Sequence, residues 1–293
     1  PWRPPLPPPV PYSHPEHAWG GGTALSMGSE AAAFGWEWPG PGEEGPRAVG
    51  GMAAGMVAAG LAAAGVLLWG VSAPYGRHGR RGWGPELPAR LAWVIQELPS
   101  LAVPLALLGS ARSDCLADPG STALLGLFVA HYFQRTLIFP LLIRGGKPTP
   151  ASVCLLALLF CLYNGFMQGY QLLLLCPAVP LDACFYAGIA TWGIGLGINL
   201  HSDHVLRNLR APGETGYKIP RGGCFEWVSG ANFFGEILEW AGFALAARSP
   251  PAVAFALFTL CNIGPRALQH HRWYLERFPD YPPGRRALVP GII

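Results

Sequence analysis

The chain has 293 residues, of which 51% are hydrophobic and 13% are charged, and its formal net charge is +3. Soluble domains carry about 25% charged residues, so this composition argues against a soluble globular protein. It favours a protein that lies in membrane lipid, and nothing in it suggests a nucleic-acid partner.

Residues 1–48 differ in composition from the rest of the chain. They include the stretches PWRPPLPPPVPYSHP and WEWPGPGEEGP, which are too rich in Pro and Gly to bury a hydrophobic core. We expect this segment to be disordered or to be a non-native extension of the protein. Met52 or Met56 could be the true first residue, and a chain that began at either one would enter the membrane at once. Residues 49–293 are then expected to form one membrane domain.

Seven apolar runs follow the N-terminal segment. About 20 consecutive, mostly apolar residues cross a bilayer core as a helix, so the runs predict an all-α polytopic membrane protein with seven transmembrane helices. The sixth run carries two glutamates and the seventh is short. The runs cover residues 52–71, 91–108, 122–143, 152–176, 184–200, 225–247 and 251–263.

The loops between these runs differ in their content of Lys and Arg. The loops after runs one, three and five and the tail after run seven hold fifteen such residues, whereas the other loops hold only Arg112 and Arg248. Because cytoplasmic loops are enriched in Lys and Arg, this asymmetry predicts a cytosolic C-terminus.

Several polar side chains interrupt the apolar runs. An ionisable group inside a span is costly, so it usually faces a cavity and indicates function. The three polar residues in the sixth run, Asn232, Glu236 and Glu239, are spaced i, i+4, i+7 and so share one helical face, which must look inward. Interhelical hydrogen bonds are one explanation, and a polar pocket of a transporter, a receptor or an enzyme is the other. The residues are Gln96, Glu97, His131, Tyr132, Arg135, Asn232, Glu236 and Glu239.

The stretch HSDHVLRNLRAPGETGYKIPRGG at 201–223 directly follows the fifth run, on the side predicted to be cytosolic. Arg and Lys bind phosphate through charge-assisted hydrogen bonds, and Gly and Pro let the backbone approach a ligand. We therefore expect a phosphate-rich ligand here, although the basic residues could also serve only to set the topology. The candidates are Arg144, Arg207, Arg210, Lys218 and Arg221.

Three other patterns are weaker. The histidines in HSDH and QHHR are too few for a membrane di-iron centre, so no metal is expected. The segment GIGLG at 193–197 is similar to a dinucleotide-binding fingerprint, but it lies inside an apolar run, where close helix packing explains it better. The seven cysteines include Cys154, Cys161 and Cys261 inside apolar runs and form no CxxC pair, which favours buried free thiols over a disulfide framework.

From about Tyr75 to the C-terminus the chain resembles the steroid 5-alpha-reductase family, through segments of both types of that enzyme with a lean to type 2. The resemblance implies a seven-helix enzyme of the endoplasmic reticulum membrane that reduces the carbon 4–carbon 5 double bond of 3-keto steroids, such as testosterone and progesterone, with NADPH. A sterol-binding receptor or transporter without redox chemistry is the alternative, and the oligomeric state is open. The segments are PARLAWVIQELPS, HYFQRT, LLIRGGKP, GINLHSDHVLRNLR, PGETGYKIPRGG, SGANFFGEILEW and QHHRWYLERFPDYP.

The same resemblance implies roles for individual residues. Glu97 and Tyr132 would grip the 3-keto oxygen of the steroid, with Trp93 and Gln96 nearby, and a Tyr donor would stabilise negative charge on that oxygen. Residues 199–293 would form the cytosolic NADPH-binding portion. The implied cofactor-binding residues are Tyr75, Arg135, Arg144, Asn199, Asp203, Arg210, Tyr217, Lys218, Asn232, Glu236, His270 and Tyr274.

Overall fold

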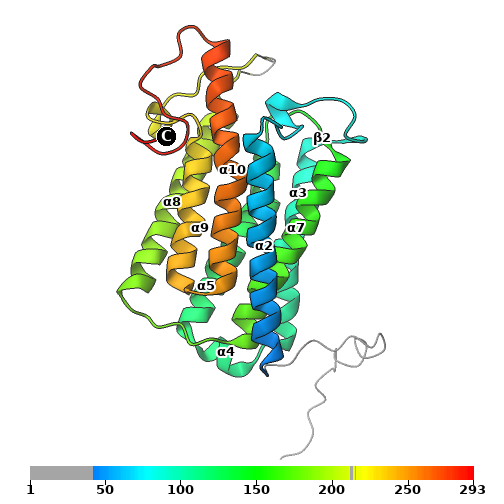
Figure 1. Ribbon diagram of the computed structural model, residues 1–293, viewed down its shortest axis with the longest axis vertical. Coiled ribbons are helices and arrows are strands. Elements are labelled where there is room, and N and C mark those ends of the chain that lie inside the picture. Colours follow the sequence, from blue (N-terminus) through cyan, green and yellow to red (C-terminus); the bar gives the residue numbers. More distant parts are fainter. Residues whose placement is uncertain (1–41, 212–213, 215) are drawn as a thin grey trace, which may run out of the picture. The chain divides into compact units, whose positions relative to one another are not determined.

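The long apolar runs form helices, because a helix satisfies its backbone polar groups internally and lipid offers them no other partner. The computed structural model describes residues 42–211, 214 and 216–293, and in them the long helices lie side by side as an up-and-down bundle (Figure 1). These helices are α2 (Glu44–Leu68), α3 (Ala89–Leu107), α5 (Pro119–Phe133), α7 (Ala151–Tyr170), α8 (Ala183–Asn208), α9 (Ala231–Ala247) and α10 (Pro250–Arg277).

Short elements close the two ends of the bundle. At one end β1 (Glu86–Leu87) pairs antiparallel with β2 (Thr149–Pro150), and at the other end α4 (Ser113–Ala117) links α3 to α5 (Figure 1). The remaining short helices are η1 (Gly76–His78), η2 (Leu108–Ser110), η3 (Gln134–Ile138), α6 (Phe139–Leu142), η4 (Gln171–Leu175) and η5 (Gly223–Glu226).

The prediction of an all-α membrane bundle is confirmed, and six of the seven predicted spans are matched by helical segments of spanning length. Six helical segments of the described chain are long and apolar enough to cross a membrane: residues 44–68, 89–110, 119–142, 151–175, 183–208 and 250–277. The sixth predicted run does not form one continuous helix. It contains the end of η5 and then α9, whose 17 residues give a length of about 25 Å, short of a hydrocarbon core of about 30 Å.

Both ends of the membrane domain also differ from their predicted boundaries. Helix α2 begins at Glu44, inside the segment expected to be unstructured up to residue 48, and residues 1–41 of that segment lie outside the described residues. Helix α10 continues from the predicted end at residue 263 through Pro265 to Arg277. Pro265 and Ala267 are buried, so tertiary packing offsets the hydrogen bond that a proline removes from a helix interior.

A π-helical turn, η3, follows α5 and contains Arg135. Pro140 has no N–H to donate to the carbonyl four residues earlier, and its ring would clash there, which accounts for the wider turn before it. The turn leaves Arg135 and Thr136 buried in the bundle although both are polar. Pro140 thus explains a local backbone change at a residue that the sequence marks as functional.

Helices α8 and α9 approach each other closely through glycines. A Cβ added to Gly195 would lie 2.3 Å from the backbone nitrogen of Glu239, and one added to Gly242 would lie 2.4 Å from that of Trp192. The predicted packing role of GIGLG is therefore confirmed for Gly195. A Cβ at Gly193 or Gly197 would meet no atom within 4 Å.

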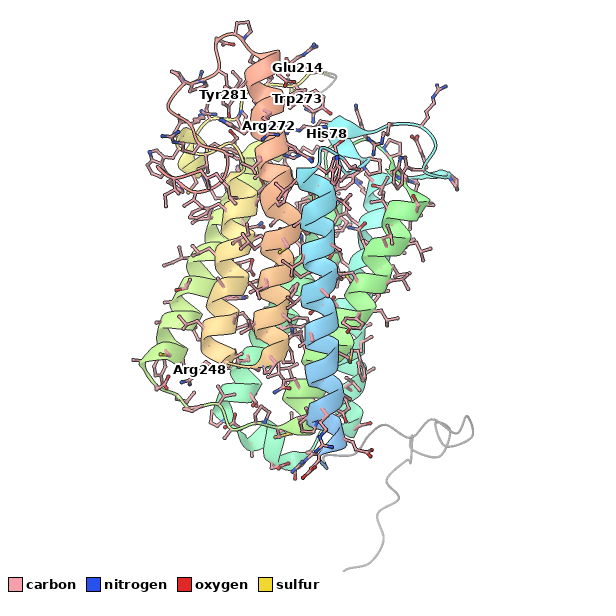
Figure 2. All side chains as sticks on the ribbon, viewed as in Figure 1. His78, Glu214, Arg248, Arg272, Trp273 and Tyr281 are labelled. Atoms are coloured by element: carbon pink, nitrogen blue, oxygen red, sulfur yellow. A yellow bond between two sulfur atoms is a disulfide. The ribbon has the colours of Figure 1, made fainter. Side chains whose placement is uncertain are left out.

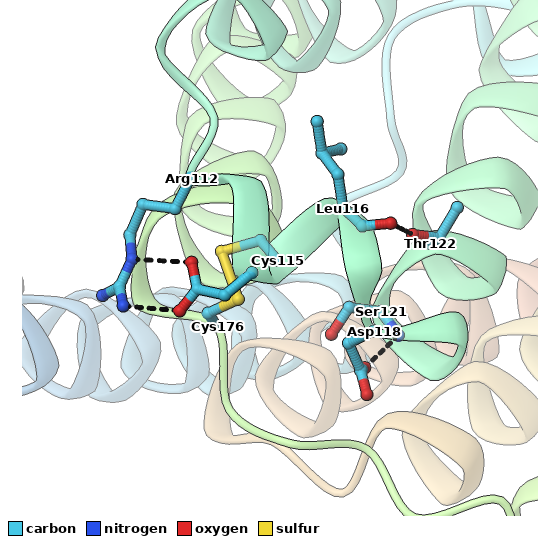
Figure 3. The surroundings of a disulfide bond; sticks show 8 residues. Arg112, Cys115, Leu116, Asp118, Ser121, Thr122 and Cys176 are labelled. Carbon is cyan, nitrogen blue, oxygen red and sulfur yellow. Dashed lines mark hydrogen bonds and ion pairs between the residues drawn. A yellow bond between two sulfur atoms is a disulfide. The ribbon is translucent and has the colours of Figure 1, made fainter. Parts of the chain in front are cut away.

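A disulfide bond joins Cys115 of α4 to Cys176, the residue after η4 (Figure 3). The expectation of free thiols was therefore wrong for these two cysteines, whereas Cys154 and Cys161 are buried and free. The two bonded residues are 61 positions apart in the sequence, and only the fold brings them together. Cys115 follows the second predicted run and Cys176 is the last residue of the fourth, so both lie on the side that the basic residues predict to be non-cytosolic.

Candidate active site

A buried ionic layer crosses the bundle at η3. Arg135 donates from Nη1 to Asp203 Oδ2 of α8 at 3.1 Å and from Nη2 to Glu236 Oε2 of α9 at 3.4 Å. Its guanidinium carbon lies 4.7 Å from the ring centres of Trp93 and Phe139. Arg135 therefore satisfies two carboxylates that the membrane interior would otherwise leave unpaired.

A second polar contact lies one turn earlier along α5. His131 Nδ1 is 2.6 Å from Glu239 Oε1, and both side chains are almost fully buried. Since Glu236 contacts η3 and Glu239 contacts α5, both inside the bundle, the inward-looking face predicted for the sixth run is confirmed. Asn232 belongs to the same face, and its backbone oxygen accepts a hydrogen bond from Asn199 Nδ2 at 3.0 Å.

Glu97 of α3 and Tyr132 of α5 both contact α7, at positions one turn apart on that helix. Gln96 Nε2 donates to Glu97 Oε1 at 3.1 Å, and the Cys161 thiol lies 3.7 Å from Glu97 Oε2. Tyr132 is 3% exposed, and its Oη lies 3.4 Å from Asn164 Nδ2.

The surroundings of Tyr132 are aromatic. The ring centres of Phe128, His131 and Trp240 lie 4.8, 5.0 and 6.0 Å from that of Tyr132. Together they belong to or adjoin the largest hydrophobic cluster of the bundle. A carboxyl group and a phenol in such surroundings can bind a mostly apolar molecule that carries one oxygen.

A cavity of about 870 Å³ opens at the end of the bundle that carries the C-terminus. This volume lies near the upper end of the 300–1,000 Å³ range common for ligand sites. Figure 2 shows two of its lining residues, His78 and Glu214, at that end, whereas Arg248 lies at the opposite end. The lining contains seven Lys or Arg side chains: Arg77, Arg144, Lys147, Arg207, Arg210, Lys218 and Arg266.

The cavity holds two polar groups that suit an anion. Arg77 packs its guanidinium 4.6 Å from the ring centre of Tyr274 and 4.9 Å from that of Trp273, yet its Nη1 is buried without a hydrogen-bond partner among the described residues. The same holds for His78 Nε2. Burial, and then the charges of Arg77, Arg266 and Arg80, lower the pKa of His78, so the arginines carry most of the positive charge at neutral pH.

Two glycines allow the backbone to turn at the rim of this cavity. Gly145 and Gly146 follow Arg144 with φ values of +70° and +109°, a region that favours glycine. Arg144 donates to Asn208 Oδ1 at 2.8 Å, which connects this turn to the end of α8. Glu214 pairs with Lys218 at the same rim, and this contact lowers the pKa of Glu214.

The structure divides the twelve residues expected to bind the cofactor into two groups. Seven line the cavity: Tyr75, Arg144, Arg210, Tyr217, Lys218, His270 and Tyr274. The other five lie in or beside the ionic layer: Arg135, Asn199, Asp203, Asn232 and Glu236. The groups are neighbours, because Asp203 is one helical turn before the cavity residues Leu206 and Arg207.

Sequence reasoning did not assign cofactor roles to several cavity residues. Arg77 and Lys147 were counted only for topology, and Arg207 only as one of several possible phosphate ligands. His78 and Gln269 were assigned no role, since a single polar residue near the end of an apolar run is common. By contrast, Arg221, also a possible phosphate ligand, is not among the lining residues.

Comparisons with known proteins identify relatives. The family described as 3-oxo-5-alpha-steroid 4-dehydrogenase matches residues 147–293. The chain is 52% identical to 3-oxo-5-alpha-steroid 4-dehydrogenase 1 of Mus musculus over 226 residues, which is 76% of this chain and 89% of that protein. It is 49% identical to the type 1 protein of Homo sapiens, over 76% of this chain and 87% of that protein. It is 50% identical to the type 2 protein of Homo sapiens, over 74% of this chain and 87% of that protein. These identities do not separate the two types.

Proposed function

Because the chain belongs to the 3-oxo-5-alpha-steroid 4-dehydrogenase family, we propose that it reduces the carbon 4–carbon 5 double bond of 3-keto steroids, testosterone and progesterone among them, with NADPH. Membership of a family of enzymes sets aside the alternative of a receptor or transporter without redox chemistry. The observation that supports the choice of cofactor is the basic cavity, which the ionic layer around Arg135 connects to the region of Glu97 and Tyr132. Incubating membranes that contain the protein with testosterone and NADPH should yield the 5-alpha product.

The cavity suits the phosphate groups of NADPH. Seven basic side chains surround it, and Arg77 Nη1 and His78 Nε2 have no hydrogen-bond partner in the described part of the chain, so they can contact an anion. We assign Arg210, Arg144 and Lys218 to these phosphates. Tyr217, which is half-buried at the cavity, offers an aromatic face on which a planar base can stack, and Tyr274 supports Arg77 from below. When bound, NADPH supplies a hydride.

The ionic layer around Arg135 would contact the nicotinamide end of the cofactor. Asn199, Asn232 and the carboxylates around Arg135 offer both donors and acceptors there. Because Arg135 already has two carboxylate partners, we assign it to holding Asp203 and Glu236 in place for that contact. This layer lies between the cavity and the Glu97 region along the helices, so it can join the two sites.

Tyr132 and Glu97 would act on the 3-keto oxygen of the steroid. As carbon 5 gains a hydride, the electrons of the double bond move toward that oxygen, which becomes negatively charged. A preorganised phenol O–H stabilises such charge far better in a dry interior than in water. Glu97 is held by Gln96 and by the Cys161 thiol, one turn of α7 before the Asn164 that contacts the phenol, so we assign its carboxyl group to the same steroid oxygen.

Arg210→Ala should raise the KM for NADPH by roughly 10- to 150-fold, since a hydrogen bond to a charged group contributes about 1.5–3 kcal/mol. Arg210 lines the cavity with its guanidinium 5.6 Å from the ring centre of Tyr217. The KM for steroid at saturating NADPH should change little. Steady-state kinetics with each substrate varied in turn provides the measurement.

Two control substitutions make this result specific. Arg272→Ala removes an exposed arginine at the same end of the bundle, outside the cavity lining, and Arg112→Ala removes one at the other end that pairs with Asp114. Both should leave the KM for NADPH within about twofold, as expected for exposed ion pairs. If all three variants raised it equally, the basic cluster would serve only orientation.

We further propose that the protein lies in the endoplasmic reticulum membrane with the cavity and C-terminus in the cytosol. The disulfide supports this orientation, because such bonds form in the oxidising lumen and Cys115 and Cys176 lie at the end away from the cavity. In sealed microsomes a membrane-impermeant reductant should leave the bond intact, and it should reduce the bond after permeabilisation. Reduction of equal extent in sealed microsomes would place this end in the cytosol. Maleimide labelling with a gel shift reports the outcome.

A further inference from the structure

Helix α7 carries buried polar side chains on a face that is otherwise apolar. Asn164 and Gln168 are one turn apart and are 0% and 1% exposed. Burying a side-chain amide is costly unless it forms hydrogen bonds, so two amides one turn apart in a membrane span need specific hydrogen-bond partners. Neither residue belongs to the steroid or cofactor contacts proposed above.

The hydrogen bonds of these amides run in one direction. Gln168 Nε2 donates to the backbone oxygen of Pro251 at 2.9 Å, an atom that can only accept. The same amino group lies 3.3 Å from Asn164 Oδ1, which accepts its second hydrogen. Asn164 must then turn its own amino group to Tyr132, where Nδ2 lies 3.4 Å from Oη. The acceptor at Pro251 thus fixes the orientation of both amides.

This direction has a consequence for Tyr132. Its phenol oxygen accepts a hydrogen bond from Asn164, so its own hydrogen remains available to a ligand. A phenol that accepts one hydrogen bond is also a stronger donor of the next, because hydrogen bonds in a chain polarise one another. We propose that Asn164 is a positioning residue that keeps Tyr132 as a hydrogen-bond donor to the steroid oxygen, and that Gln168 sets its orientation. This inference rests on the role proposed for Tyr132.

The sharpest test is Asn164→Asp, which keeps the size of the side chain. When the new carboxyl group is ionised it can only accept, so it takes the Tyr132 hydrogen away from the steroid. When it is protonated it can again donate to the phenol. We expect a kcat about tenfold or more below wild type at high pH, the effect of about one hydrogen bond, with recovery toward wild type at low pH. The KM for NADPH should stay unchanged.

Asn164→Ala and Gln168→Met complete the series. Asn164→Ala removes the donor but leaves the phenol hydrogen free, so its kcat should exceed that of Asn164→Asp at high pH and follow the wild-type pH profile. Gln168→Met removes the orientation of Asn164 and should lower kcat severalfold. Gln171→Met is the matched control, since Gln171 is a buried amide in η4, one turn further along the chain than Gln168, and this variant should keep wild-type kcat.

Several outcomes would overturn the inference. One is an Asn164→Asp variant with the kcat and pH profile of wild type. Another is an equal loss at every pH in both Asn164 variants together with lowered unfolding temperatures, which would indicate a packing role. If Asn164→Asp fails to fold, equal kcat values for Gln168→Met and Gln171→Met contradict the proposal, and a loss confined to Gln168→Met supports it. A Tyr132→Phe variant assayed in parallel must lose turnover; if it does not, the proposed function of Tyr132 fails first.

Discussion

Tyr132→Phe should lower kcat about a hundredfold, the typical effect of removing one donor to a developing oxyanion. The substitution removes a single oxygen atom from a ring packed against Phe128 and His131, so the fold should persist. NADPH binding should be unaffected, because Tyr132 does not line the basic cavity. Steady-state kinetics for the steroid and a fluorescence titration for NADPH provide the two measurements.

Tyr163→Phe is the matched control for this experiment. Tyr163 lies on α7, and its hydroxyl donates to the backbone oxygen of Met52 in α2 at 2.8 Å. Its loss should leave kcat within about twofold, since the net contribution of one such hydrogen bond to stability is about 0.5–1.5 kcal/mol. A Tyr132→Phe variant that turned over as fast as Tyr163→Phe would remove the phenol from the mechanism.

Arg135→Met should destabilise the protein by about 3–5 kcal/mol, the usual cost of removing one partner from a buried ion pair. Asp203 and Glu236 would lose their shared cation, and the stacking against Trp93 and Phe139 would weaken. Arg135→Lys keeps the charge but cannot reach both carboxylates with a planar fork, so we expect a smaller loss. Thermal unfolding of the purified protein in detergent, without cofactor, measures both.

Removing the charge of Arg135 and of both its carboxylate partners separates the cost of an unpaired buried charge from the cost of lost packing. Adding Asp203→Asn and Glu236→Gln to Arg135→Met should recover part of the lost stability, because no buried charge then remains unpaired. Arg112→Met breaks the exposed pair with Asp114 and should change stability by about 1 kcal/mol or less. An Arg135→Met protein as stable as wild type would show that Arg135 serves only the cofactor.

The sequence predicted much of this architecture because membrane helices follow local rules. The spacing of Asn232, Glu236 and Glu239 gave the correct inward face of α9, since helical periodicity alone determines which side chains share a face. Gly195 was correctly assigned to helix packing for the same reason. The length of α9 was not predicted, because hydropathy does not show that the apolar run is divided into η5, a non-helical segment and α9, which begins at Ala231.

Contacts between distant segments account for what the sequence did not give. The partnership of His131 with Glu239 joins positions 108 residues apart, and no local pattern indicates it. The Cys115–Cys176 bond depends on two loops that meet only in the folded bundle. Arg77 gave only a topological signal, yet the fold surrounds it with Tyr217, Trp273 and Tyr274. Such residues become visible only once the helices are placed.

The most direct test of the central claim follows the hydride itself. The purified protein, reconstituted in lipid vesicles, is given testosterone and NADPH that carries deuterium at the reactive carbon of the nicotinamide, and the product is analysed by mass spectrometry and NMR. We expect the 5-alpha product with one deuterium at carbon 5 for each NADPH consumed. The absence of this product, or a product without deuterium at carbon 5, would contradict the assignment of the basic cavity and the Glu97–Tyr132 region to one reductase site.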